Sequence, residues 1–196
     1  MDVDAVGLGH YGRRENYCKK QVERWAKQYL ASTGEGKPDR SPRMLELIDW
    51  LKQHIPAEDS KIRSKTGLVH EDLRIDNLLF HPSEDRVIGV LDWELSTLGN
   101  PMSDVAYNCM CFLINNNEFP VPQYGFDNGI MPEGVPSLEE HLANYCAAAG
   151  VQWPAKDWKF YIALSLLRSA SIFAGAYHRW LKGNASGGNM PSLLDA

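Results

Sequence analysis

The chain has 196 residues, 44% of them hydrophobic, so it can bury one core and is close to the usual size of a single domain. Its formal net charge is -5, and its 20 Lys and Arg residues are scattered among 25 acidic ones, which argues against binding to nucleic acid. The four cysteines lack the spacing of a metal site or a disulfide framework, and no apolar run reaches the ~20 residues of a membrane span, so we expect an intracellular protein that binds no membrane.

The N-terminal part of the chain predicts two helices. Apolar residues recur at three- and four-residue spacing from Val22 to Leu30, and Asn16 is the expected N-terminal cap of this first helix. A loop rich in Gly and Pro follows over 33–42, and a second apolar stripe begins at Met44. Both stripes are the core faces of ordinary helices, so they locate structure and carry no chemistry.

Short apolar runs replace the helical pattern from Gly67 onward. The runs over 77–80 and 87–91 are separated by turn residues at 82–85, which predicts a small β-hairpin. The most polar loop of the chain, residues 70–77, leads directly into this hairpin. The hairpin is therefore the element that should carry the functional site.

The second half of the chain predicts three further helices, whose start signals are Asp104, the capping box formed by Ser137 and Glu140, and Asp157. The Gly- and Pro-rich segment 120–136 is expected to be irregular, and the last helix should run over about 158–181. Residues 183–196 are expected to form a flexible tail, which leaves 1–182 as the domain. Helices dominate and no regular βαβα alternation is present, so the predicted class is α+β, mainly helical, with one small hairpin.

The polar loop contains the pattern H-x-D-x4-N, formed by His70, Asp72 and Asn77, and a later apolar strand ends at Asp92. Phosphoryl transfer needs a carboxylate to align the attacking hydroxyl and hard oxygen ligands to hold Mg²⁺ on the phosphates of ATP. Asp72 fits the first role, and Asn77 and Asp92 fit the second. The loop lies between two apolar runs that are expected to be strands, and this context makes a chance match to the pattern less probable.

Three neighbouring residues are weaker candidates for the same site. Asp76 precedes an Asn in a turn, where Asp commonly caps backbone N–H groups. Glu94 lies two residues beyond Asp92 and either faces the same site or is a surface residue. Arg74 either reaches an anionic substrate group or pairs with a nearby acid, and pairing is the favoured interpretation.

The loop and the later Asp resemble the H-G-D-x4-N loop and the I-D-W/F string of the aminoglycoside phosphotransferase and choline kinase family. The longer strings 69–82 and 90–101 look still closer to the kinase-like domain that is fused to acyl-CoA dehydrogenases in plants and animals. The similarity runs from about residue 11 to residue 188. It implies that the chain is the C-terminal lobe of a protein-kinase-like fold.

The resemblance also implies a role for each site residue. Asp72 would be the catalytic base, and Asn77 and Asp92 would bind Mg²⁺, with ATP as the co-substrate. His70 would brace the loop, and Asp104 would hydrogen-bond it from the start of a helix. A hydroxyl group of a small molecule would receive the phosphoryl group.

The chain departs from the family pattern in two ways. Glu71 stands where the family has Gly, and we expect this bulky acid to restrict the loop or to repel phosphate. The phosphate-covering N-terminal lobe has no counterpart before His70, and the G-x-G-x-x-G letters at 7–12 follow no strand, so they are interpreted as coincidence. Without that lobe the chain should be incomplete and should expose a hydrophobic edge.

Three functions remain open at this stage. The first is an ATP- and Mg²⁺-dependent kinase whose acceptor is either a cationic molecule or a hydroxyacyl metabolite. The second is a non-catalytic pseudokinase or docking remnant. The third is a metallohydrolase cluster made by His70, Asp72, Asp76, His81 and Asp92.

The resemblance also bears on partners and location. A longer relative would supply an N-terminal lobe or an acyl-CoA dehydrogenase domain. The chain shows no targeting signal, and Leu194-Asp195-Ala196 is not a peroxisomal address. The expected location is intracellular, in the cytoplasm or the peroxisome.

Overall fold

The computed structural model describes residues 2–34, 40–59, 66–114, 125–126 and 130–183. The predicted irregular segment 120–136 lies partly outside these residues, and the predicted tail 183–196 lies almost wholly outside them. The helices are α1 (Tyr17–Ser32), α2 (Pro42–Gln53), α3 (Met102–Asn108), α4 (Leu138–Ala149) and α5 (Trp158–Leu181). The strands are β1 (Gly67–Val69), β2 (Leu78–Phe80), β3 (Val87–Val90) and β4 (Thr97–Gly99). The predicted α+β, mainly helical class is confirmed.

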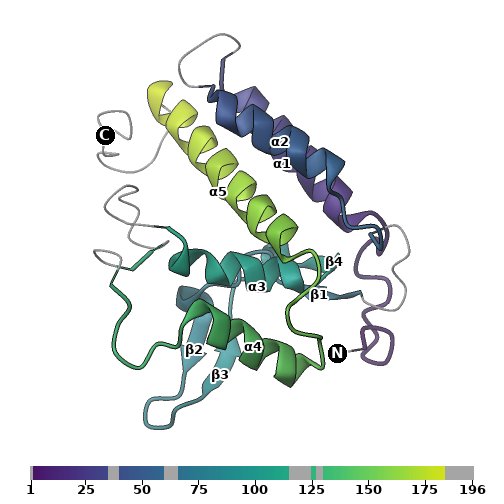
Figure 1. Ribbon diagram of the computed structural model, residues 1–196, viewed down its shortest axis with the longest axis vertical. Helices are drawn as coiled ribbons and strands as arrows, with labels where there is room; N and C mark the ends of the chain where they lie inside the picture. The colour runs from purple at the N-terminus through teal and green to yellow at the C-terminus, as the bar shows by residue number, and fades with distance from the viewer. Residues whose placement is uncertain (1, 35–39, 60–65, 115–124, 127–129, 184–196) are drawn as a thin grey trace.

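The helix α5 is the centre of the fold. It lies lengthwise beside α1 and α2. The helices α3 and α4 lie toward the N-terminal end of α5, together with the strands (Figure 1). The apolar stripe predicted for α1 is buried against it, with Val22 1%, Trp25 5% and Tyr29 4% exposed. On α5 itself the buried apolar side chains of this core are Phe160, Tyr161, Leu164 and Leu167. Burial of these faces holds the helices in place.

Length and composition alone would allow α5 to cross a membrane, with a mean hydropathy of 1.3 over its most apolar 18 residues. Half of that window is buried inside the fold, where α5 packs against α1, α2 and α3. A core helix passes the same test of length and composition. These contacts show α5 as a helix of the packed core.

Two of the predicted caps, Asn16 and Asp157, make no side-chain capping hydrogen bond. They do precede α1 and α5, but both have a left-handed backbone. The start of α1 is capped instead by Asp59, whose carboxylate accepts from the backbone N–H of Cys18 at 2.8 Å and of Lys19 at 3.0 Å. The prediction that Asn16 caps this helix by its side chain is wrong, because a residue distant in sequence supplies the acceptor.

The predicted capping box of α4 is confirmed. The hydroxyl of Ser137 accepts from the backbone N–H of Glu140 at 3.3 Å, and the carboxylate of Glu140 accepts from the backbone N–H of Ser137 at 2.9 Å. This signal is local in sequence, so it could be recognised without the structure.

The strands form two separate antiparallel pairs in the described residues, although a single pair was predicted. The predicted hairpin is β2 with β3, in which Leu78 pairs with Val90. The second pair is β1 with β4, in which Gly67 lies opposite Gly99. Gly99 allows α1 to pack closely on this pair, since a Cβ atom there would lie 2.5 Å from the ring of Tyr17.

The hairpin β2–β3 exposes apolar side chains on its surface. Exposed apolar residues on the hairpin and on the turns beside it are Ile75, Leu79, Phe80, Val87, Ile88, Leu91, Trp93 and Leu95. This agrees with the exposed hydrophobic edge that the sequence predicts, since such a group of side chains usually marks an interaction surface.

Candidate active site

The polar loop is fixed to α3 by Asp104. Its carboxylate lies in the first turn of α3 and accepts from the backbone N–H of His70 at 2.6 Å and of Glu71 at 2.9 Å. Burial raises the pKa of Asp104 to about 6, although the two hydrogen bonds from the loop oppose this rise. The geometry agrees with the supporting role that the resemblance implies for Asp104.

His70 joins the loop to the strand that precedes Asp92. The residue is 2% exposed, and its Nε2 atom lies 2.7 Å from the backbone oxygen of Leu91. Its Nδ1 atom accepts from the backbone N–H of Asp72 at 3.2 Å, which leaves Nε2 as the donor to Leu91. Both ring nitrogens are thus engaged in bracing backbone, and this favours the structural role over direct catalysis.

Asp72 and Asn77 are brought together by the loop. The Nδ2 atom of Asn77 donates to the backbone oxygen of Asp72 at 2.8 Å and to its carboxylate at 3.0 Å. The backbone N–H of Leu91 donates to the backbone oxygen of Asn77 at 2.8 Å, so Asp92 follows one residue beyond this contact. The loop and the end of β3 therefore meet at the position where the sequence predicts the site.

The three weaker candidates differ in their surroundings. Arg74 pairs with two acids, since its Nε lies 3.4 Å from Asp72 and its Nη2 lies 3.0 Å from Asp76. The prediction that Arg74 pairs with nearby acids is confirmed. Glu94 is exposed on the single turn Trp93–Leu95 and does not lie on a strand.

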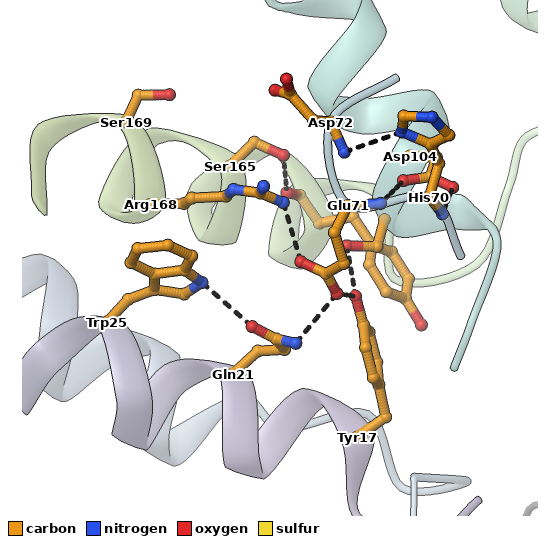
Figure 2. A network of polar contacts seen from close by, with 12 residues as sticks. Tyr17, Gln21, Trp25, His70, Glu71, Asp72, Asp104, Ser165, Arg168 and Ser169 are labelled. Carbon is orange, nitrogen blue, oxygen red and sulfur yellow. Dashed lines mark hydrogen bonds and ion pairs between the residues drawn. The ribbon is translucent and has the colours of Figure 1, made fainter. Parts of the chain in front are cut away.

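Glu71 points to the opposite side of the loop from Asp72 (Figure 2). Its side chain is 3% exposed and accepts hydrogen bonds from the hydroxyl of Tyr17 and from Nε2 of Gln21 at 2.9 Å. Its other oxygen lies 2.8 Å from Nη1 of Arg168, with which it forms a buried ion pair. The expectation that Glu71 repels phosphate is therefore wrong, because its charge is paired within the core.

The partners of Glu71 are the site residues that sequence reasoning missed. Tyr17 and Gln21 look like ordinary residues of a helix face, and burial together with the charge of Glu71 raises the pKa of Tyr17 well above its usual value. Arg168 is the one of these partners that stands out in the sequence, because it is a lone cation in the middle of the apolar run that forms α5. A buried cation requires a partner, so this position could have been questioned from sequence.

A pocket of about 590 Å³ lies beside the loop. Its walls come from the loop, from α3 and the turn that follows it, and from α4, and they include Arg74, Ile75, Asp76, Tyr107, Asn108, Met110, Phe112, Phe126 and His141. A volume of this size and a mainly apolar lining with a few polar groups are typical of small-molecule sites.

The described residues contain no group of three or more His, Cys, Asp or Glu side chains that could hold a metal ion. The metallohydrolase cluster considered from sequence is therefore not supported in this part of the chain. A magnesium site of the kinase type needs fewer protein ligands, because nucleotide phosphates and water complete it. In the side chain of Asn77 the Nδ2 atom donates to Asp72, so Oδ1 is the atom that could serve as a ligand in such a site.

The chain is similar to proteins of a known family. The family model described as the phosphotransferase enzyme family matches residues 1–141. A Ralstonia eutropha protein, whose crystal structure is described as that of an aminoglycoside phosphotransferase, superposes with a TM-score of 0.79 at 43% identity, over 95% of this chain and 54% of that one. The predicted C-terminal lobe of an aminoglycoside phosphotransferase fold is thereby confirmed.

Longer relatives carry the name of another enzyme. An Arabidopsis thaliana protein described as an acyl-CoA dehydrogenase, IBR3, is 61% identical over 95% of this chain, which spans 23% of that protein. Acyl-CoA dehydrogenase family member 10 of Mus musculus is 40% identical over 95% of this chain, which spans 16% of that protein. The chain thus spans less than a quarter of these relatives. On the family match and the structural similarity together, the chain belongs to the phosphotransferase enzyme family.

Proposed function

We propose that the chain carries the acceptor-binding and Mg²⁺-binding half of an ATP-dependent phosphotransferase that acts on a hydroxyl group of a small molecule. The observation that carries this proposal is the hydrogen bond between Asn77 and the carboxylate of Asp72, in a loop that is held by Asp104 and leads through Leu91 to Asp92. A base and two oxygen ligands within one short loop and the adjacent strand end suit phosphoryl transfer.

Asp72 acts on the acceptor. Its carboxylate accepts the hydrogen bond of the attacking hydroxyl and aligns the oxygen with the γ-phosphate. It takes up the proton as the new O–P bond forms and the bond from the γ-phosphorus to the bridging oxygen breaks, so that ADP leaves with that oxygen. The oxygens of Asn77 and Asp92 would hold Mg²⁺, which when bound neutralises charge on the phosphates. Arg74 and Asn77 both contact Asp72, so its carboxylate is kept in one orientation.

The pocket of about 590 Å³ is the place for the acceptor, because Arg74 and Asp76 belong both to its wall and to the loop. Arg74 pairs with both Asp72 and Asp76, so the acids at this entrance are largely offset by a cation. That arrangement gives little reason for a cationic acceptor. Of the two acceptors considered, a hydroxyacyl metabolite is favoured, in line with the acyl-CoA dehydrogenase names of the longer relatives.

Direct tests are ATP consumption and Mg-ATP titration. The chain, supplemented with the ATP-binding lobe of a relative, should consume Mg-ATP in the presence of a hydroxyacyl acceptor. Asp72→Asn should reduce turnover by about 100-fold or more while Mg-ATP binding is unchanged, because general-base catalysis contributes factors of this size. Turnover equal to that of the unchanged chain would contradict the proposal.

A non-catalytic docking module is the second candidate, and the exposed apolar hairpin β2–β3 is the observation that favours it. Calorimetry with Mg-ATP on the intact chain separates the two functions. Binding at submillimolar concentration contradicts a pure docking remnant, whereas absence of binding and of turnover in the supplemented chain supports it.

A further inference from the structure

We propose that Glu71 and Arg168 form a buried pair that positions the catalytic base, so that Glu71 is a positioning residue for Asp72. The inference rests on the proposed role of Asp72, but the contacts on which it is built are independent of that role. Glu71 occupies the position that the family fills with Gly, directly before Asp72.

The backbone of Glu71 adopts a conformation that suits glycine. Its φ angle is 69°, in the left-handed region of backbone conformation that residues with a Cβ atom rarely adopt. Its N–H group is held by Asp104 on α3, so this conformation is fixed from the backbone side. A residue other than Gly persists in such a conformation only when the surroundings hold it there.

The contacts of the Glu71 side chain also help to hold this backbone conformation. Its carboxylate is bound by Tyr17 and Gln21 of α1 and by Arg168 of α5. The network continues beyond these contacts, because Nε1 of Trp25 donates to the Oε1 atom of Gln21 at 3.0 Å, which orients the amide toward Glu71. Three helices therefore fix the residue that precedes Asp72.

Arg168 is built into the core as the partner of this carboxylate. It is 6% exposed, and its guanidinium carbon lies 4.7 Å from the ring centre of Tyr107 and 5.3 Å from that of Trp25. Contact with two aromatic faces limits its rotation and stabilises its charge away from water. Without Glu71 this cation would remain buried and unpaired, so the two residues depend on each other.

The geometry connects this pair to the direction of Asp72. The carboxylates of Glu71 and Asp72 point to opposite sides of the loop (Figure 2). Because Glu71 is held at its N–H and at its carboxylate, the peptide that leads to Asp72 has little freedom to rotate. The contact of Asn77 with the Asp72 carboxylate is then made from a fixed position.

The test uses NMR on the full chain without metal or nucleotide. Glu71→Gln and Arg168→Met remove one charge each, and Ile48→Ala is the control, because Ile48 is buried on α2 and has no part in the site. The readouts are the side-chain amide signals of Asn77, the ring nitrogen shifts of His70 and hydrogen exchange of the loop amides. Thermal unfolding is recorded for all variants.

In Glu71→Gln and Arg168→Met we expect the Asn77 amide signals to shift or broaden. We also expect the loop amides to exchange at least about tenfold faster than in Ile48→Ala, when variants with the same loss of stability are compared. Unchanged Asn77 and His70 signals with only a lower unfolding temperature would overturn the proposal, since that is the behaviour of an ordinary core residue. If either variant does not fold, Glu71→Asp and Arg168→Lys keep the charges and must show the same changes in weaker form.

A double variant completes the test. Glu71→Gly with Arg168→Met restores the family residue and removes both charges, and we expect its loop signals to remain broader than those of the unchanged chain. Signals equal to those of the unchanged chain would overturn the positioning role, because glycine alone would then suffice. None of these readouts requires phosphotransfer. A negative activity assay would therefore count against the proposed function and would not decide whether Glu71 and Arg168 position the loop.

Discussion

The two halves of the loop that carries the candidate site are held in different ways. The first half, His70 and Glu71, is only 2% and 3% exposed and is bound by side chains from α1, α3 and α5. The second half is open to solvent, with Ile75 70% exposed and the side chain of Asp76 55% exposed. Asp72 lies between them.

The second half has side-chain contacts within the loop itself. Asn77 bonds back to Asp72, and Arg74 pairs with Asp72 and Asp76, all within the same loop. The buried half can therefore set the position of Asp72 while the open half remains accessible to ligands. This division suits a site that needs both a fixed base and access for small molecules.

The strongest test of the comparison is Arg168→Met. Removing one partner leaves the carboxylate of Glu71 buried without its cation, and such a change costs about 3–5 kcal/mol in the free energy of unfolding. The matched control is Arg86→Met, because Arg86 pairs with Glu84 on the surface, where the side chains are 56% and 55% exposed. That pair should contribute less than about 1 kcal/mol. Urea unfolding measures both, and equal losses would contradict a distinct role for the buried half.

The second prediction concerns Asp104 and pH. Its pKa is about 6 in the folded chain against an ordinary value of 3.8, so the folded state binds more protons between these values. The contribution of Asp104 to stability is therefore fully present below pH about 4 and is lost as the pH rises through about 6, by on the order of 2–3 kcal/mol.

Unfolding of the unchanged chain and of Asp104→Asn across pH 4.5 to 7.5 isolates this effect. The stability of the unchanged chain relative to the variant should fall as the pH rises and become constant above about pH 7. A difference that is flat or rises over the same range would show that Asp104 has no raised pKa in the folded chain.

The third prediction tests the contact that links the two halves. Asn77→Ala removes the two hydrogen bonds from Nδ2 to Asp72 and should lower the free energy of unfolding by about 1 kcal/mol. Asp85→Ala, at an exposed position between the strands of the hairpin, serves as the control and should cause almost no change. If both variants unfold alike, the contact of Asn77 with Asp72 does not help to hold the loop.

The same division explains what could be predicted from the sequence. The residues of the open half, together with Asp72 and Asp92, follow a short pattern whose spacing indicates their chemistry. The partners of Glu71 could not be found in this way, because Gln21, Tyr17 and Arg168 are 50, 54 and 97 positions away. The pairing of a buried acid with a cation on a distant helix is a property of the tertiary structure.

The fold shows the same limit. Helical periodicity predicted α1 and α2, and helix start signals predicted α4 and α5, because both kinds of signal are local in sequence. The pair β1 and β4 was missed as a pair, since each strand has three residues and the partners are separated by the whole site. The cap of α1 was missed for a similar reason, because Asp59 is 41 positions from Cys18.

The smallest expected effect is that of Asp76→Ala. Asp76 pairs with Arg74 at 3.0 Å, but its side chain is 55% exposed, so water screens the interaction and either side chain can move into solvent. The free energy of unfolding should change by less than about 0.5 kcal/mol, and the change should vanish at about 1 M salt. Urea unfolding at low and high salt measures both quantities. A loss above about 2 kcal/mol that persists in salt would mean that the open half holds the loop as firmly as the buried half, and the difference between the two halves would then be one of exposure alone.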